Sequence, residues 1–75
     1  MNARRRKELD KLVEELENIK VMLESLKDEE EEYRDNIPDS FEAKIEIADD
    51  AIYAMESAID SIDEAIDHVD EAQDA

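Results

Sequence analysis

Apolar residues recur at alternating spacings of three and four along the first half of the chain. They are Leu9, Leu12, Leu16, Ile19, Leu23, Leu26, Tyr33 and Ile37, and Glu30 is the single polar interruption. This is the a/d pattern of a seven-residue coiled-coil repeat (positions a to g), which places these side chains in one seam along an α-helix. The pattern predicts a long helix over residues 3–34.

The same pattern returns after a break around Pro38. Proline lacks a backbone N–H and disfavours helical geometry at the residue before it, so a loop is expected over residues 35–40. The second seam is Phe41, Ile45, Ala48, Ile52, Met55, Ile59, Ile62, Ile66 and Val69. It predicts a helix over residues 41–73, with Asp39 or Ser40 as its N-cap and Glu42 completing a capping box.

The two seams match when the chain folds back on itself about residue 39. Tyr33 then faces Ile45, Leu26 faces Ile52 and Leu9 faces Val69, and the two residue numbers have the same sum in every layer. A short loop favours antiparallel packing of neighbouring helices. The sequence therefore predicts an all-α, single-domain protein (residues 1–75), a long antiparallel two-helix coiled-coil hairpin.

The charged residues beside the seam agree with this orientation. At the e positions the first helix carries mostly bases and the second only acids, and antiparallel packing brings these two columns to one edge. The predicted ion pairs are Arg34–Glu42, Lys27–Asp49, Lys20–Glu56 and Arg6–Asp70.

The opposite edge carries small side chains, which let another helix approach closely. The residues predicted to mediate self-association are Met22, Ile47, Ala51, Ala54, Ala58, Ala65 and Ala72. A domain of this size seldom gains more than about 3–5 kcal/mol from its own core, and the chain has no cysteine for a disulfide. We therefore expect a homodimer in which two hairpins form a four-helix bundle; the alternative is that alanine only favours the helical state.

A formal net charge of −16 restricts the possible partners. Nucleic acid and anionic membranes should repel the chain, so we expect direct binding to neither. No apolar run is long enough to span a bilayer. The basic start, Arg4-Arg5-Arg6-Lys7, is followed by acidic residues rather than the apolar stretch of a signal peptide. The absence of cysteine agrees with an expected cytoplasmic location.

Residue patterns that support catalysis are absent from the sequence. There is one histidine, no cysteine and no glycine-rich phosphate loop, so no catalytic or cofactor-binding residue is predicted and an enzyme is not expected. Glu64 and His68 do not have the Glu-x-x-His spacing of di-iron bundles, and His68 is expected at the surface. The aspartates lack EF-hand spacing, so no metal site is predicted.

The second helix carries most of its acids on the outward face. Counting both faces, seven acids of this helix are aspartates in the stretch 49–74, although aspartate is a poorer helix former than glutamate. The residues predicted to bind a partner are Glu46, Asp50, Tyr53, Asp60, Glu64, Asp67, Glu71 and Asp74. Acids at the b and e positions recur about every 5 Å of helix rise, a spacing comparable to, though not matching, that of phosphates along one DNA strand, about 3.4 Å apart.

The acidic face and the apolar stripe suggest two alternative functions. In the first, the protein is a nucleic-acid mimic that occupies the basic cleft of an otherwise unknown DNA- or RNA-binding protein. In the second, it is a structural or adaptor coiled coil whose apolar stripe docks on a partner helix. Acidity could also serve only solubility, although that needs a net charge of only about 2–8.

Several short segments carry a resemblance to a known group of proteins. They are Arg5-Arg6-Lys7-x-Leu9, Leu23-Glu24-x-Leu26-x-Asp28-Glu29-Glu30-Glu31, Asp35-Asn36-Ile37-Pro38, Ala51-Ile52 and Ala58-Ile59-Asp60. With them, nearly the whole chain resembles small acidic proteins common in phages and prophages of Firmicutes, a group without an assigned activity; the segment after Pro38 is shorter here. The resemblance implies a mobile-element context, in which small acidic proteins often antagonise host defence nucleases. It identifies no site residues.

Overall fold

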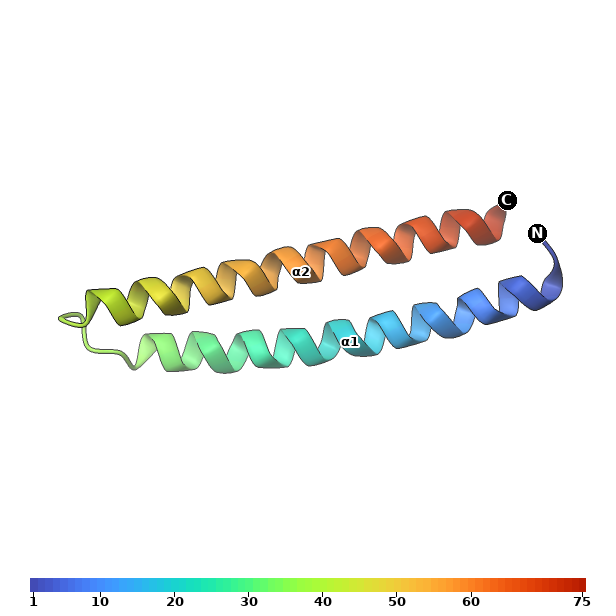
Figure 1. Ribbon diagram of the computed structural model, residues 1–75. Helices are drawn as coiled ribbons and strands as arrows, with labels where there is room; N and C mark the ends of the chain where they lie inside the picture. Colours follow the sequence, from blue (N-terminus) through green and yellow to red (C-terminus); the bar gives the residue numbers. More distant parts are fainter.

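The computed structural model describes residues 1–75 as two long α-helices joined by a short loop (Figure 1). Helix α1 spans Ala3–Asp35 and helix α2 spans Glu42–Asp74. The helices run antiparallel, and both termini lie at the end opposite the loop. The predicted hairpin is confirmed, with each helix boundary within one residue of its predicted place.

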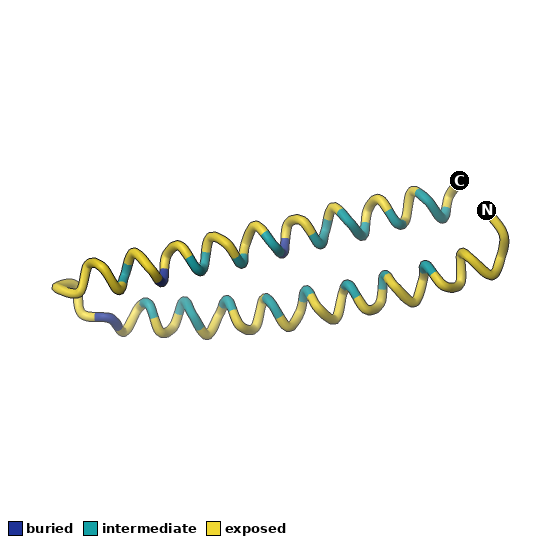
Figure 2. The backbone as a smooth tube through the Cα atoms, in the orientation of Figure 1, coloured by how far each residue is buried: buried dark blue, intermediate teal, exposed yellow.

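The molecule is elongated. It measures 59 × 15 × 10 Å and has a radius of gyration of 17.2 Å, whereas a compact domain of this length would have about 11 Å. Only Ile37, Ala48 and Ile59 are buried. The hairpin is thus a single layer of two helices, and most side chains remain in contact with solvent (Figure 2).

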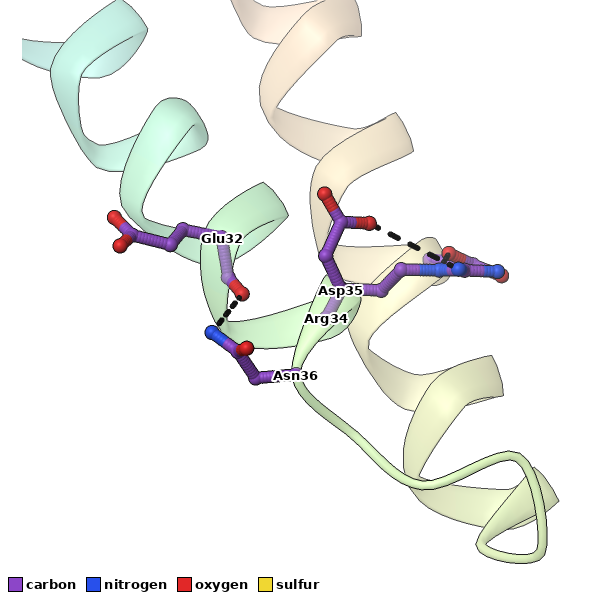
Figure 3. Close-up of polar contacts among 5 residues, drawn as sticks. Glu32, Arg34, Asp35 and Asn36 are labelled. Carbon is purple, nitrogen blue, oxygen red and sulfur yellow. Dashed lines mark hydrogen bonds and ion pairs between the residues drawn. The ribbon is translucent and has the colours of Figure 1, made fainter.

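Asparagines define both ends of α1. At its start the Asn2 carboxamide oxygen accepts a hydrogen bond of 2.8 Å from the Arg5 N–H, an N-cap that the sequence interpretation did not include. At its end the Asn36 N–H bonds to the Tyr33 carbonyl, and the Asn36 side chain donates to the Glu32 carbonyl at 3.0 Å (Figure 3). Both ends of the helix therefore have local partners for their free backbone groups.

The start of α2 differs from the prediction. The Phe41 N–H donates to the Pro38 carbonyl at 2.9 Å, which closes a turn and places Phe41 itself at the N-cap without a side-chain hydrogen bond. The predicted capping box is therefore wrong, because the turn leaves Asp39 and Ser40 too early in the chain to cap the helix. Phe41 is 50% exposed, so its predicted place in the seam is also wrong.

The rest of the α2 seam is confirmed. Every member is buried or half-buried: Ile45, Ala48, Ile52, Met55, Ile59, Ile62, Ile66 and Val69. In Figure 2 the half-buried and buried positions of α2 follow the side that faces α1. Helix α2 therefore presents its predicted apolar face to α1.

In α1 only half of the predicted seam packs against α2. The a positions are half-buried or buried (Leu9, Leu16, Leu23, Glu30 and Ile37), whereas the d positions Leu12, Ile19, Leu26 and Tyr33 are 48–54% exposed. Their places in the contact are taken by the half-buried e positions Val13, Lys20, Lys27 and Arg34. Helix α1 is thus rotated about its axis relative to the prediction. The aliphatic parts of its long basic side chains lie against α2 while their charged ends reach the surface.

Candidate interaction surfaces

Three ion pairs join the helices along one edge of the hairpin, which we call the charged edge. Lys20 Nζ lies 2.7 Å from Asp63, Lys27 Nζ lies 3.5 Å from Glu56, and Arg34 Nε donates to Asp49 at 2.8 Å. Each base also lies near an acid of its own helix: Glu24, Glu31 and Asp35 respectively (Figure 3 for Arg34 and Asp35).

The charged edge has the predicted columns but other pairs. Each base contacts the acid one repeat further from the loop than predicted, so Arg34–Glu42, Lys27–Asp49 and Lys20–Glu56 are wrong. Side chains on a helix lean toward its N-terminus, so in an antiparallel pair the bases lean away from the loop and the acids lean toward it. This lean makes the more distant acid the nearer partner.

The predicted pair Arg6–Asp70 is also wrong, since Arg6 forms no ion pair. At this end of the hairpin the Gln73 carboxamide donates to the Arg6 carbonyl at 3.2 Å and to the Asp10 carboxylate. The contact joins the last turn of α2 to the first turns of α1, as the predicted register requires.

The ion pairs raise the pKa of all three basic groups. The hydrogen bond to Asp63 raises the pKa of Lys20 above its ordinary value. The pKa of Lys27 is also raised: burial lowers it, but the charges of Glu31 and Glu56 outweigh that effect. The hydrogen bond from Arg34 to Asp49 raises the pKa of the guanidinium in the same way. All three bases therefore keep their positive charge to a higher pH than they would without these acids.

The acids of α2 occupy only three of the seven repeat positions. All twelve lie at b, e or f, and none lies at a, c, d or g. Three e-position acids pair with bases of α1, which leaves nine without a base from that helix. The outward b and f positions contain the predicted partner-binding residues, which we call the acidic face: Glu46, Asp50, Tyr53, Asp60, Glu64, Asp67, Glu71 and Asp74. All eight are exposed, along about 42 Å of helix.

The edge opposite the ion pairs is apolar and open. It combines the exposed d positions of α1 with the g positions of α2, as a shallow cavity of about 200 Å³ at the loop end shows: Tyr33 and Lys44 both line it. We call this surface the apolar edge; its members are Leu12, Ile19, Met22, Leu26 and Tyr33 of α1 and Ala51, Ala58, Ala65 and Ala72 of α2, with Ile47 and Ala54 alongside.

The structure thus brings the predicted self-association residues to one side of the hairpin. Met22 and Ile47 are 66% and 70% exposed, and Ala54 is exposed, whereas the other four alanines are half-buried against α1. The sequence interpretation missed the contribution of Leu12, Ile19, Leu26 and Tyr33, which it assigned to the seam. The sequence did contain an indication of this surface. Four of the seven repeat positions of α2 contain no acid, and together they form a surface wider than one neighbouring helix covers.

Groups for binding small ligands do not converge anywhere on the hairpin. No group of three or more His, Asp or Glu side chains could hold a metal ion, and no buried side chain lacks a hydrogen-bond partner. His68 is 76% exposed and lies 3.5 Å from Glu71. Neither helix has a stretch long and apolar enough to cross a membrane. The arrangement offers extended surfaces, one acidic and one apolar.

No known protein family, curated protein or solved structure matches the chain. The function is therefore inferred from these two surfaces.

Proposed function

We propose that this chain is a non-enzymatic interaction protein whose acidic face binds a basic protein surface. The partner would be a DNA- or RNA-binding protein whose cleft the acidic face occupies in place of nucleic acid. In the mobile-element setting that the resemblance implies, a host defence protein is such a partner. The observation that carries the proposal is the segregation of the acids of α2 to three repeat positions, of which b and f contain no base.

The geometry of the acidic face suits a long basic cleft. Seven carboxylates follow about 42 Å of rigid helix, or one about every 7 Å, compared with one phosphate about every 3.4 Å along a DNA strand. The short aspartate side chains keep their charges close to the helix. Tyr53 lies among them and is 72% exposed, so it can contact an aromatic or arginine side chain of a partner.

A purely solubilising role explains this distribution less well. Solubility depends on net charge and on mixed signs spread over the surface, and about 2–8 units suffice for a small domain. Here the net charge is −16, and the outer half of one helix carries a single sign. A partner surface of opposite sign gives a reason for both features.

The test uses two variants with the same net charge. One neutralises three residues of the acidic face (Asp60→Asn, Glu64→Gln, Asp67→Asn), and the matched control neutralises three exposed acids of α1 (Glu14→Gln, Glu17→Gln, Asp28→Asn). Each protein is immobilised, incubated with bacterial extract at low salt, and eluted first with duplex DNA and then with salt. We expect the wild type and the control to retain nucleic-acid-binding proteins that DNA displaces. The acidic-face variant should retain at least ten-fold less of these proteins.

Equal losses in both variants would show that only overall charge matters, which contradicts the proposal. Circular dichroism of each variant checks that the hairpin is intact. Since every substituted residue is exposed, the helicity of each variant should equal that of the wild type.

The second candidate function is an adaptor coiled coil that docks on a helix of another protein. The exposed apolar residues of α1 favour it, because Leu12, Ile19 and Leu26 could enter a groove between partner helices. Apolar docking survives high salt, whereas binding through the acidic face falls steeply with salt. A partner that is retained in high salt and is not displaced by DNA would support the adaptor.

A further inference from the structure

The hairpin leaves more surface in water than a protein of its size ordinarily does. It exposes 5754 Å², whereas a compact monomer of 8.7 kDa exposes about 4,700 Å². The excess, about 1,000 Å², is close to the area of about 800 Å² that each partner contributes to a stable protein–protein interface. A partner that covered this excess area at the apolar edge would bury large apolar side chains.

Helix α2 has an acid-free surface that is wider than one neighbouring helix covers. Positions a, c, d and g contain no acid, and together they cover more than half of its circumference. Helix α1 covers the a and d positions and part of g, but Ile47 and Ala54 at the c positions remain exposed. The acid-free surface therefore extends beyond the helix that contacts it.

On α1 the charges beside the apolar edge change sign from one end to the other. At positions c, d and g, residues 4–15 include three bases (Arg4, Arg5 and Lys11) and two acids. Residues 18–26 at these positions are all uncharged, and residues 29–36 include two acids, Glu29 and Glu32, and no base. A helix with one basic end and one acidic end is complementary to an antiparallel copy of itself.

We propose that the apolar edge binds a second copy of this chain in antiparallel orientation, forming a four-helix bundle. A two-fold axis across the middle of the edge places α1 beside α1 of the other copy and α2 beside the other α2. Met22 then lies near the centre on α1. On α2 the centre falls between Ala54 and Ala58, whose small side chains permit close approach of the helices.

This arrangement satisfies both surfaces of the hairpin. The apolar residues of the two copies cover one another, as in four-helix bundles. The two acidic faces, on positions b and f, lie away from the shared interface, so their repulsion is small. The dimer does not require the function proposed for the acidic face, and the two proposals fail separately.

The first test compares two neighbouring residues with the same chemistry. Met22 lies on the apolar edge and is 66% exposed; Val21 lies outside it and is 64% exposed. We expect sedimentation equilibrium of the wild type to give twice the chain mass of 8.7 kDa. Met22→Glu should raise the dimer dissociation constant at least ten-fold, and Val21→Glu should leave it unchanged.

A monomeric wild type at high micromolar concentration, or equal effects of the two substitutions, would overturn the proposal. Circular dichroism distinguishes loss of the dimer from loss of the fold: Met22→Glu should remain helical, because the residue is already exposed in the single hairpin. A wild type that associates only with another protein of the extract would assign the apolar edge to the adaptor function instead.

The second test determines the orientation with introduced thiols, since the chain has no cysteine. Lys11 and Glu32 are separated by about 30 Å along α1, so antiparallel docking brings Lys11 of one copy near Glu32 of the other. With a short thiol-reactive cross-linker, a mixture of Lys11→Cys and Glu32→Cys chains should give several-fold more covalent dimer than either variant alone. Equal yields from all three samples would contradict antiparallel docking.

Discussion

The two long edges of the hairpin start from the same repeat but use different chemistry. On the charged edge, Lys20, Lys27 and Arg34 reach Asp63, Glu56 and Asp49, and the helices are joined by side chains whose ends remain in water. On the apolar edge, leucine, isoleucine and tyrosine of α1 are about half exposed beside the alanines of α2. The rotation of α1 connects the two features, because turning the bases toward α2 turns the d positions away from it.

This difference indicates how the molecule is stabilised. Exposed ion pairs contribute little free energy but oppose the wrong register. Covering large apolar side chains contributes much more, about 25 cal/mol per Å². A single hairpin therefore uses its weaker means of stabilisation to fix the register and leaves part of the stronger one unused.

The largest expected effect is on stability, and it distinguishes the buried interface between α1 and α2 from the apolar edge. Ile59 is 9% exposed, so Ile59→Ala should lower the free energy of unfolding by about 2–4 kcal/mol. Ile19→Ala removes the same atoms from a side chain that is 48% exposed, and in dilute solution it should cost about 1 kcal/mol or less. Urea unfolding followed by circular dichroism measures both. Equal costs at every dilution would show that the two positions are equally buried and would contradict the observed rotation of α1.

A smaller gain is expected from filling the polar gap in the α1 seam. Glu30 is a half-buried a position, and the register places it opposite Ala48, which is 1% exposed. Glu30→Leu should stabilise the hairpin by about 1–2 kcal/mol, because it adds apolar area between the edges and reduces repulsion within the run of glutamates. Thermal unfolding measures the shift, and Glu32→Leu, at an exposed position, is the control. A gain for the control as large as for Glu30→Leu would attribute the effect to charge alone.

The hairpin itself could be predicted from sequence because its signals are redundant. Two seams of equal length, one proline and matching layers all specify the same antiparallel fold. On α2, every a/d position from Ile45 to Val69 is buried or half-buried, as the pattern predicted. The capping box failed because a backbone hydrogen bond between Phe41 and Pro38 decided where α2 begins, and local sequence does not reveal that bond.

The rotation of α1 was not predictable from its own pattern. A leucine at d and a lysine at e are neighbours around the helix, and either can face the partner when the lysine has acids to reach. The pairing of bases with more distant acids was predictable in principle, because side chains on every α-helix lean toward its N-terminus; the sequence prediction paired residues by layer alone. The exposed positions of the acidic face were predictable, because helical periodicity alone places b and f away from the seam.

The pairing on the charged edge can be resolved by double-mutant cycles. The structure predicts a favourable coupling between Lys27 and Glu56, measured with Lys27→Met and Glu56→Gln, and none between Lys27 and Asp49, measured with Asp49→Asn. The expected coupling is smaller than either effect above, because Glu56 is exposed, Lys27 is only half-buried and the pair is screened by salt. Free energies of unfolding at low ionic strength provide the measurement. Coupling to Asp49 instead of Glu56 would support the ion pair that the sequence alone predicted.

The smallest expected effect is the response of the charged edge to alkaline pH. The pKa values of Lys20 and Lys27 are raised above 10.5 in the folded chain, so their contribution is fully present below that pH and is lost as the pH rises through the raised values. Replacing both by arginine keeps the charge at higher pH. Across this window, the free energy of unfolding of the double Arg variant should fall less than that of the wild type. The two proteins differ only at these two positions, so the difference isolates the charged edge, whereas identical pH profiles would show that its ion pairs contribute no stability.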